Sequence, residues 1–320
     1  MSLLCFDAGG TALKYGLVDK NANLTQEGSV PTPHDSFESF SAAIKSIYEQ
    51  FAARAQIQGI ALSLPGRNDS KRGYCYSGGY LNYNAQRAVG PELEEILGLP
   101  VVLENDAKAA CRAEMWNGAL KGISSGVVLV LGTGLGGGIV VNSQLFSGPT
   151  GAAGELSFFL RNILEEHLEL QSLGSLWVSS TGLLTFAAQE YGLPYHLDME
   201  KGFAMPMNGI EFFAKVAAHE EPALRALKRF GRTTGRMIFS LCSVLDSERI
   251  AIGGGISAQP ALIEACREGT HECFTSEYPL HPSSLALTEP EIVACTFRNG
   301  ANLIGAAHGF QEKHPEIELS

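Results

Sequence analysis

Carboxylates and glycines stand together at the ends of several apolar segments of this sequence, where they could handle phosphate groups. The first such motif runs Asp-Ala-Gly-Gly-Thr from Asp7 to Thr11 and is followed by Lys14, a further candidate for nucleotide binding. Gly9 and Gly10 would let the backbone approach a phosphate, and the threonine adds a hydroxyl donor. The aspartate would repel a phosphate, so its expected role is to hold magnesium through water. Taken alone, the motif fits an ordinary hairpin turn equally well.

A second glycine-rich motif, Gly-Thr-Gly-Leu-Gly-Gly-Gly, occupies residues 132–138. It lies between two apolar segments, Val127–Leu131 and Ile139–Val141, and so repeats the strand–turn–strand layout of the first motif. A single glycine-rich turn is weak evidence for function. Two such units, one in each predicted lobe, would grip the phosphates of ATP from both sides, because backbone N–H groups bind anions.

A third motif, Glu-Asn-Asp-Ala at residues 104–107, ends an apolar strand and begins a helix that runs to about Trp116. Asn and Asp are common N-caps, which is the plain structural interpretation, but a cap does not require both residues. Asp106 could accept a proton from a substrate hydroxyl while Asn105 hydrogen-bonds another hydroxyl. Phosphoryl transfer needs little beyond such positioning and the neutralisation of charge.

A fourth motif, Ile-Ala-Ile-Gly-Gly-Gly at residues 250–255, is an apolar strand that ends in three glycines. Such a turn could cradle adenosine, because side chains at these positions would block the flat base. A tight connection between a strand and a helix explains the same residues equally well when they are taken alone.

Predicted strands and helices alternate along the chain, which indicates an α/β protein. Glycine turns between adjacent strands predict antiparallel hairpins within the sheets, so the pattern is not purely of the Rossmann type. The predicted strands are Leu3–Asp7, Leu13–Val18, Ile60–Leu64, Val101–Glu104, Val127–Leu131, Ile139–Val141, Arg249–Ile252 and Ile292–Thr296. The predicted helices lie at 34–54, 90–98 and 106–116, over much of 161–246, from Pro260 onward and at about 300–310.

A chain of 320 residues is long enough for two lobes, with the active site expected in the cleft between them. Small residues from Gly118 to Ser125 interrupt two ordered patterns and mark the expected boundary. We therefore expect a small lobe over residues 1–118, which holds the first glycine motif and Asp106, and a large lobe over 119–297. A C-terminal helix at about 298–312 is expected to pack back on the small lobe.

The composition excludes several classes of protein. The formal net charge of −11 and the lack of any basic run disfavour nucleic acid as a partner. The seven cysteines are scattered and form no CxxC pair, and the first residues read as a strand and not as a signal segment. No stretch approaches the ~20 apolar residues that would span a bilayer. These features predict a cytoplasmic protein with reduced cysteines and no membrane partner.

Taken together and in this order, the four motifs resemble the ROK family of sugar kinases and repressors, and in particular its glucokinases and β-glucoside kinases. The resemblance extends from Asp7 to the segment Asn-Gly-Ala-Asn-Leu-Ile-Gly-Ala-Ala at 299–307. It implies a two-lobed actin/hexokinase-like ATPase fold with ribonuclease H-like mixed sheets. It also implies magnesium-ATP as the phosphoryl donor and a hexose as the acceptor.

The resemblance implies roles for individual residues. Asp7, Gly9, Gly10 and Thr11 match the first phosphate loop of the family, Gly132, Thr133 and Gly134 match the second, and Gly254 and Gly255 match the adenosine turn. On the sugar side it implies Asp106 as the catalytic base, Asn105 as a sugar ligand, and Glu155, which ends the segment Gly151–Glu155, as a ligand of sugar hydroxyls. Gly66, which follows the strand Ile60–Leu64, is a further candidate for substrate binding.

The sequence departs from the family where many members carry a histidine and a structural zinc motif. Phe158 stands in place of the histidine, the segment 173–182 holds no cysteine, and Trp177 stands in place of a second glutamate. Structural zinc needs about four Cys or His ligands, so we expect no zinc site here. The group of Cys266, His271 and Cys273 is too sparse to replace it.

These departures bear on the substrate, because the replaced residues contact the C1 and C2 side of the sugar in the family. Phe158 and Trp177 would offer apolar faces on which a second sugar ring could stack. We therefore expect the acceptor to be a β-glucoside disaccharide or glucose, phosphorylated on O6. Alternatively, both aromatic residues fill core space, or the acceptor is N-acetylmannosamine, since relatives that lack the zinc motif include such kinases.

Other classes of function compete with a kinase. A repressor would carry a DNA-binding helix-turn-helix ahead of the first phosphate loop, and that loop begins here at residue 7, which leaves no room for it. A sugar sensor without catalysis is disfavoured by the intact Asn105 and Asp106, and an actin-like or chaperone-like ATPase by the sugar segment. The predicted helices at 210–246 are a candidate face for a homodimer.

Overall fold

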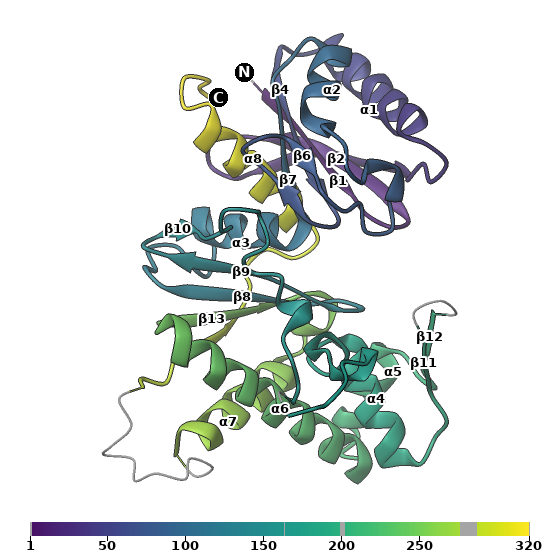
Figure 1. Ribbon diagram of the computed structural model, residues 1–320, viewed down its shortest axis with the longest axis vertical. Helices are drawn as coiled ribbons and strands as arrows, with labels where there is room; N and C mark the ends of the chain where they lie inside the picture. The colour runs from purple at the N-terminus through teal and green to yellow at the C-terminus, as the bar shows by residue number, and fades with distance from the viewer. Residues whose placement is uncertain (1, 163, 199–201, 276–286, 320) are drawn as a thin grey trace. The chain divides into compact units, whose positions relative to one another are not determined.

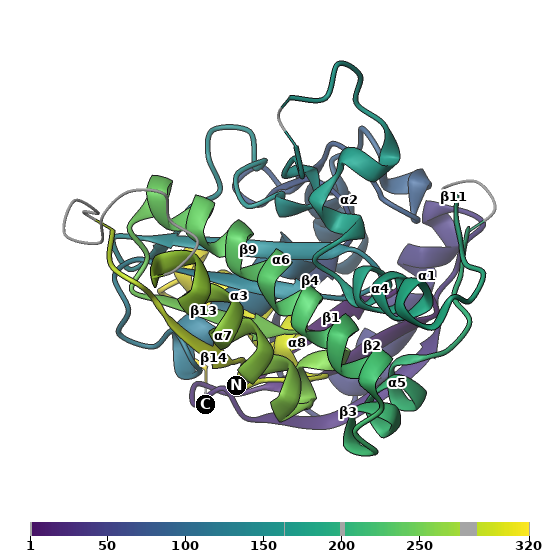
Figure 2. The same cartoon turned by 90° about the horizontal axis from the view of Figure 1, so that it is seen from below.

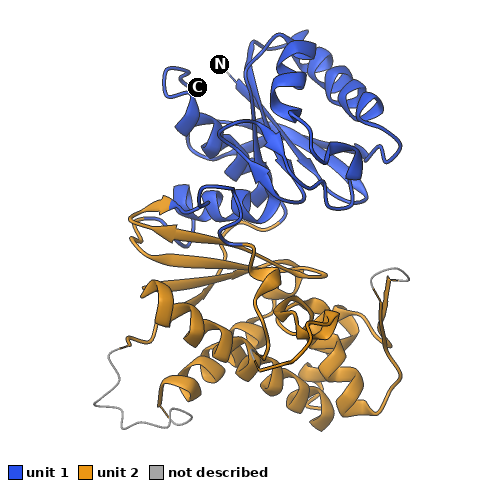
Figure 3. Ribbon diagram, in the orientation of Figure 1, with its two compact units in different colours: residues 1–121, 145–154, 299–320 blue, residues 122–144, 155–298 orange. Residues whose placement is uncertain are grey.

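The computed structural model describes residues 2–162, 164–198, 202–275 and 287–319. The chain divides into two compact units, shown in blue and orange in Figure 3. Unit 1 comprises Met1–Lys121, Leu145–Gly154 and Asn299–Ser320, and unit 2 comprises Gly122–Gln144 and Glu155–Arg298. Unit 1 thus includes the segment 145–154, which the sequence analysis assigns to the large lobe. The two sheets described below lie one in each unit.

The sheet of unit 1 has five strands in the order β3-β2-β1-β4-β7. Strands β1 (Ser2–Ala8), β2 (Ala12–Val18) and β3 (Leu24–Pro31) form an antiparallel meander, whereas β4 (Ile57–Leu64) and β7 (Val101–Asn105) run parallel to β1. β1, β4 and β7 are almost continuously apolar because both faces of the sheet are covered.

Helices cover both faces of the unit 1 sheet (Figure 1). α1 (Phe37–Ala52) and α2 (Val89–Leu97) join the core that contains Leu4, Phe6 and Ile60. α8 (Ala301–Lys313) packs on the opposite face, where its Phe310 ring lies against Gly59. Side chains alternate between the faces of a strand, so residues of odd number in β1 point toward α8. α3 (Asp106–Asn117) packs along α8.

The sheet of unit 2 repeats this strand pattern, in the order β10-β9-β8-β13-β14. β8 and β9 form an antiparallel hairpin, and β13 and β14 run parallel to β8. The bounds are β8 (Gly126–Leu131), β9 (Leu135–Val141), β10 (Gln144–Leu145), β13 (Arg249–Gly253) and β14 (Glu291–Ala294). The predicted strands and their order along the chain are therefore confirmed for both sheets, although β3 and β10 were not predicted.

Four helices accompany the sheet of unit 2 in the described part of the chain: α4 (Ser180–Tyr191), α5 (Gly209–Ala217), α6 (Glu221–Leu245) and α7 (Pro260–Thr275). α6 and α7 lie side by side in both views (Figure 1, Figure 2). None of the described helices is both long and apolar enough to pass through a membrane.

The prediction of mostly helical structure over 161–246 was wrong for parts of that range. Short 3₁₀ turns at Leu170–Ser172 and Gly174–Leu176 precede α4. β11 (His196–Asp198) and β12 (Gly202–Ala204) then form an antiparallel pair between α4 and α5. Glycines and prolines in these stretches, such as Gly174 and Pro194, interrupt the helical spacing that the apolar residues suggested.

Candidate functional site

Three of the predicted segments meet at one edge of the unit 1 sheet. β1, β4 and β7 are parallel, so their carboxyl ends lie on the same side of the sheet. β1 ends with Asp7 and Ala8, β4 leads directly to Gly66, and β7 ends with Asn105 just before Asp106. The carboxyl edge of parallel strands is the usual place for a ligand in α/β proteins.

Asp7 is buried and its carboxylate is held in one orientation. Ser63 Oγ and Asn302 Nδ2 both donate to Asp7 Oδ1, each at 3.0 Å, and Lys14 Nζ lies 3.8 Å from Oδ2. Ser63 comes from β4 and Asn302 from the first turn of α8. Both donors engage the same oxygen, so Oδ2 is the atom that remains for a water-mediated metal contact.

The glycine turn after β1 is fixed by neighbouring backbone and side-chain groups. The N–H of Gly9 donates to the carbonyls of Asp7 and Ala12, each at 3.1 Å. Thr32 Oγ1 donates to the carbonyl of Gly9 at 2.7 Å. Thr11 in the same turn is exposed. The turn is therefore fixed at Gly9 by three hydrogen bonds, while its hydroxyl-bearing end faces solvent.

Asn105 organises the junction between β7 and α3. Its Oδ1 accepts from the backbone N–H of Lys108 at 3.1 Å, which makes it the N-cap of the helix. Its Nδ2 donates to the carbonyl of Gly66 and to Asp106 Oδ1, each at 2.9 Å. Both amide hydrogens are thus used, and the carbonyl oxygen keeps one lone pair for a further donor such as a sugar hydroxyl.

Asp106 and Gly66 are placed by the same set of contacts. Asp106 Oδ1 also accepts from the N–H of Ala107 at 2.8 Å, which fixes the carboxylate at the start of α3. Gly66 has a φ of +84°, and a Cβ on it would lie 1.9 Å from the carbonyl oxygen of Ser77. Only glycine fits there, so the carbonyl that holds Asn105 depends on this residue type.

Tyr80 lies near both candidate carboxylates. Its hydroxyl donates to the carbonyl of Ala8 at 3.1 Å, and its ring lies beside Gly10. Burial raises the pKa of Tyr80, and the negative charges of Asp106 and Asp7 raise it further. One phenol that is influenced by both carboxylates indicates that the ends of β1 and β7 share one electrostatic environment.

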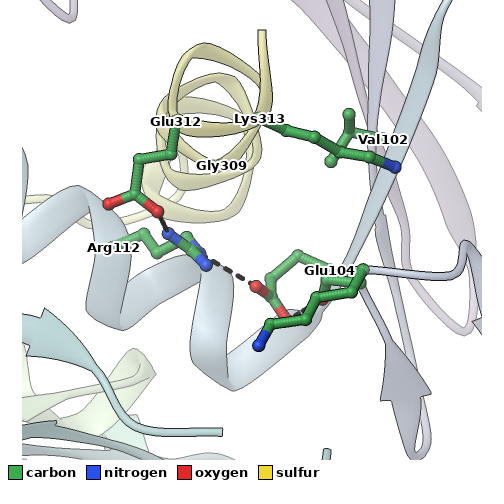
Figure 4. Close-up of a pocket in the computed structure, with 8 residues that line it drawn as sticks. Val102, Glu104, Arg112, Gly309, Glu312 and Lys313 are labelled. Atoms are coloured by element: carbon green, nitrogen blue, oxygen red, sulfur yellow. Dashed lines mark hydrogen bonds and ion pairs between the residues drawn. The ribbon is translucent and has the colours of Figure 1, made fainter. Parts of the chain in front are cut away.

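Behind this edge of the sheet, Glu104 forms the centre of a buried ion-pair network. Its Oε1 accepts from Ser70 Oγ at 2.8 Å and from the N–H of Asn105 at 3.0 Å, and its Oε2 accepts from Arg112 Nε at 2.8 Å. On its other side Arg112 pairs with Glu312 of α8 (Figure 4). Burial alone would lower the pKa of Arg112, but the two carboxylates raise it. A cavity of about 300 Å³ lies beside this network.

Lys108 connects α3 to the predicted sugar segment. The side chain is only 1% exposed, and its Nζ donates to the carbonyl of Gly151 at 2.5 Å. Gly151 has a φ of +72° and begins the segment Gly151–Glu155, of which residues 151–154 belong to unit 1. A buried cation in the first turn of a helix opposes the helix dipole, and this unfavourable position is the signal that sequence reasoning missed.

In unit 2, the second glycine turn lies between β8 and β9 and is held by the segment that leads into α4. The N–H of Ser180 donates to the carbonyl of Gly132 at 2.9 Å, and Thr181 Oγ1 donates to the carbonyl of Thr133 at 2.7 Å. Ser175 Oγ accepts from the N–H of Leu135 at 2.9 Å and closely approaches Gly134. None of these three supporting hydroxyl residues was predicted.

The turn after β13 lies directly beside this loop. Gly254 has a φ of +91°, and a Cβ on it would lie 2.3 Å from the carbonyl oxygen of Leu131, the residue before Gly132. A Cβ on Gly255 would meet open space. The two glycine motifs of unit 2 thus form one surface made mostly of backbone, which suits phosphate and adenosine groups.

A family model and solved relatives identify the chain. The model of the ROK family matches residues 3–313. The chain belongs to the ROK family. A β-glucoside kinase from Listeria monocytogenes is 29% identical to this ROK protein over 320 residues, which cover 99% of this chain and 100% of the relative.

Solved structures agree with this assignment. A candidate N-acetylmannosamine kinase from Listeria monocytogenes has a TM-score of 0.79 and 29% identity, over 98% of this chain and 100% of that chain. A ROK family glucokinase from Streptomyces griseus, in complex with glucose and AMPPNP, has a TM-score of 0.76 and 23% identity, over 96% of this chain and 98% of that chain. The expected family, the actin/hexokinase-like fold and the enzyme class, an ATP-dependent carbohydrate kinase, are confirmed.

The two aromatic residues at which this ROK protein departs from the family pattern lie in different surroundings. Phe158, in the 3₁₀ turn Leu156–Phe158, is 67% exposed, whereas Trp177 is 7% exposed. Trp177 packs against Phe186 with ring centroids 5.5 Å apart, its other contacts include the Arg161 guanidinium at 4.8 Å, and its Nε1 donates to the carbonyl of Gln171 at 2.7 Å. The prediction that Trp177 offers a face to a sugar was therefore wrong, because the side chain is part of the core.

The remaining predicted residues have ordinary surroundings. Glu155 is half-buried at the start of the same 3₁₀ turn, where its carbonyl accepts from the N–H of Phe158 at 3.2 Å. His271 pairs with Glu289 at 3.0 Å, and Cys266 is buried in α7, where burial raises its thiol pKa to about 12. In the described ranges no three His, Cys, Asp or Glu side chains gather as a metal site would require.

Proposed function

We propose that this chain, an ATP-dependent carbohydrate kinase of the ROK family, transfers the γ-phosphoryl group of ATP to O6 of a β-glucoside or of glucose. The observation that carries the proposal is the arrangement at the carboxyl edge of the unit 1 sheet. Asp7 lies near the end of β1 and Asp106 directly follows β7, the two strands on either side of β4, and the negative charges of both carboxylates raise the pKa of Tyr80. A carboxylate base and a second carboxylate for a metal are the two groups that phosphoryl transfer needs there.

Asp106 acts as the general base in this proposal. It accepts the proton of the sugar hydroxyl as that oxygen bonds to the γ-phosphorus, and the bond to the leaving ADP oxygen breaks. The hydrogen bonds from Asn105 and Ala107 to Asp106 Oδ1 hold the carboxylate in position for this transfer. The carbonyl of Asn105 is available to orient a hydroxyl of the sugar.

The nucleotide is bound chiefly by backbone groups. We assign the phosphates to the turns at Gly9–Thr11 and Gly132–Gly134 and the adenosine to Gly254 and Gly255, with Lys14 as an additional cation. Asp7 fits a magnesium ion through water, because its Oδ1 accepts from two donors while its Oδ2 lies 3.8 Å from Lys14 Nζ. Such an ion would neutralise the charge on the phosphates.

The preference for a β-glucoside rests on two observations. Phe158 is a large exposed aromatic residue next to Glu155, the proposed ligand of sugar hydroxyls, and such a ring can stack on a second sugar. The β-glucoside kinase relative is similar over essentially its whole length. Trp177 has no part in this preference because it is buried.

A second candidate acceptor is N-acetylmannosamine, which the similarity to a candidate kinase of that sugar favours. A catalytically inactive sugar sensor is a third candidate function, and the intact pair of Asn105 and Asp106 speaks against it.

We also propose a homodimer, since Ile210 on α5 and Val244 on α6 are large apolar side chains left exposed on the predicted dimer face. Light scattering of the purified protein measures this directly, and a monomer at micromolar concentration would remove the proposal.

The experiment that tests the proposed function is ADP release with a panel of acceptors: glucose, cellobiose, gentiobiose, N-acetylmannosamine and fructose. Turnover of cellobiose or gentiobiose with phosphorus on O6, located by NMR, supports the β-glucoside assignment. Turnover of N-acetylmannosamine alone replaces it with the second candidate. No turnover with any acceptor, while a non-hydrolysable ATP analogue and a sugar still bind, supports the sensor.

A further inference from the structure

We propose that the C-terminal helix α8 is a positioning element whose two ends hold the two catalytic carboxylate sites of unit 1 separately. Its first turn holds Asp7 through Asn302, and its last turn holds the junction of Asn105 and Asp106 through Glu312, Arg112 and Glu104. The inference rests on the roles proposed above for Asp7 and Asp106. No member of α8 was among the predicted site residues.

At its N-terminal end, α8 acts on the proposed magnesium residue. Asn302 Nδ2 donates to Asp7 Oδ1 at 3.0 Å, on the oxygen that Ser63 also engages. With both donors on Oδ1, the other oxygen, Oδ2, lies on the side of Lys14, 3.8 Å from its Nζ. Without Asn302 the carboxylate can rotate about its χ2 angle, because a single donor fixes a carboxylate poorly.

At its C-terminal end, α8 acts on the proposed base through two intermediates. Glu312 pairs with Arg112, and Arg112 Nε donates to Glu104 Oε2 at 2.8 Å. Glu104 Oε1 then accepts the N–H of Asn105, the residue that holds both Asp106 and the start of α3. Figure 4 shows Arg112 between the two carboxylates. The planar guanidinium suits this bridge because it can donate in two directions at once.

Between its ends, α8 is packed too closely to move against α3. A Cβ on Gly305 would lie 1.6 Å from the carbonyl oxygen of Ala109, so the two helices touch through their backbones. A Cβ on Gly309 would contact the Arg112 side chain at 3.4 Å. The helix is therefore a rigid support, and each of its ends fixes the carboxylate site that it contacts.

The proposal predicts different kinetic effects at the two ends. Asn302→Ala should raise the Mg²⁺ concentration for half-maximal velocity at least about ten-fold, the effect of losing one hydrogen bond to a charged group, and leave the KM for the sugar unchanged. Arg112→Lys should lower kcat about ten-fold and raise the KM for the sugar, with an unchanged requirement for Mg²⁺. Lysine keeps the charge but cannot bridge two carboxylates.

Glu312→Gln is the milder variant for the second end, since it leaves the buried pair of Arg112 and Glu104 intact and should fold even if Arg112→Lys does not. It should lower kcat about two- to three-fold, in proportion to a partly exposed ion pair, and leave the Mg²⁺ requirement unchanged. Lys313→Ala is the matched control, because Lys313 is an exposed neighbour on the same helix. It should match the wild-type enzyme in both measurements.

A helix that only stabilises the fold would change both measurements together or neither. The proposal is overturned if Asn302→Ala keeps the wild-type Mg²⁺ requirement, or if Arg112→Lys and Glu312→Gln keep wild-type kcat. Asp7→Asn separates this failure from that of the proposed function. If Asp7→Asn changes the Mg²⁺ requirement and Asn302→Ala does not, only the role of α8 is lost. If Asp7→Asn has no effect, the proposed role of Asp7 and this inference both fail.

Discussion

The two units have the same sheet topology but carry different groups at equivalent strand ends. In each, an antiparallel hairpin with a three-residue glycine turn is followed by two strands parallel to the first. The residue before the last in the first strand is Asp7 in unit 1 and Val130 in unit 2. Unit 1 thus places carboxylate and amide side chains at its sheet edge, while unit 2 places backbone.

The same strand topology can therefore present two different kinds of group at its edge. The parallel strands create an edge where segments distant in sequence converge, and this is common to both units. On the roles proposed above, the residues at the strand ends suit the edge of unit 1 to proton transfer and metal binding and that of unit 2 to holding a nucleotide. A carboxylate in the second turn would repel the phosphates, and in unit 2 the turn offers N–H groups and the hydroxyl of Thr133 instead.

The largest expected effect comes from the proposed base in unit 1. Asp106→Asn keeps the N-terminal position on α3 but cannot take a proton, so kcat should fall by at least about 10³-fold with little change in the KM for ATP. ADP release measures both values. Glu95→Gln, an exposed carboxylate on α2, is the control and should behave as wild type. Activity of Asp106→Asn within about ten-fold of the wild type would exclude Asp106 as the base.

A large effect on stability, and none on selectivity, is expected from the buried aromatic residue of unit 2. Trp177→Ala should lower the free energy of unfolding by about 3–5 kcal/mol, because it removes a large side chain from the core. Thermal unfolding measures this change. The ratio of kcat/KM for cellobiose and glucose should stay that of the wild type in the folded fraction. A change in this ratio of kcat/KM values, with an unchanged free energy of unfolding, would show that Trp177 contacts the sugar.

The nucleotide turn of unit 2 should be sensitive to a single methyl group. Gly254→Ala overlaps the carbonyl of Leu131, so the turn must shift, and the KM for ATP should rise about ten-fold while that for the sugar is unchanged. Gly192→Ala also places a side chain at a positive φ, here +64°, but its Cβ meets open space. This control should lower stability slightly and leave both KM values as they are. An equal effect of Gly254→Ala and Gly192→Ala on the KM for ATP would contradict the assignment of adenosine to the turn at Gly254.

A smaller effect is expected from the exposed aromatic residue. Phe158→Ala should raise the KM for a disaccharide acceptor about three-fold, the effect of losing one stacking contact, and leave the KM for glucose unchanged. Its melting temperature should be that of the wild type because the side chain is exposed. Equal KM changes for both sugars would show that Phe158 does not distinguish a second ring.

The smallest effect concerns pH and lies in α8 of unit 1. Burial lowers the pKa of His308 from its ordinary value, although the carboxylate of Glu312 opposes this shift. The unfolded chain therefore binds a proton at higher pH than the folded chain, so His308 costs stability as the pH falls below about 6.5. His308→Gln should flatten the decline in melting temperature between neutral and mildly acid pH. If the melting temperature of His308→Gln falls as steeply with pH as that of the wild type, other groups cause the decline.

The strand ends were predictable because short local residue patterns identify them. An apolar run followed by glycine, or by Asn-Asp, identifies the place where a strand meets a turn or a helix, and these patterns located Asp7, Asn105 and Gly254. The supports of those residues were not predictable in this way. Ser63, Asn302 and Glu312 act through contacts that span long stretches of chain, and no local pattern distinguishes them from other polar residues on a strand or helix.

Whether a single aromatic residue is buried could not be predicted from the sequence either. Phe158 and Trp177 have the same apolar character and lie in one irregular segment, yet one is exposed and the other is covered by Phe186 and Arg161. The outcome depends on where α4 packs, which local spacing does not specify. Lys108 was missed for the same reason, because its contact with the carbonyl of Gly151 spans 43 residues of chain and a lysine in the first turn of a helix is only slightly disfavoured.

The division of labour between the two units is tested most directly by calorimetric titration of a non-hydrolysable ATP analogue, with magnesium, into Asp106→Asn and Gly254→Ala. The account predicts that Asp106→Asn binds the analogue within about two-fold of the wild-type affinity, while Gly254→Ala binds it about ten-fold more weakly. The reverse order of affinities, or wild-type binding by Gly254→Ala, would contradict the assignment of chemistry to unit 1 and of nucleotide binding to the turns of unit 2.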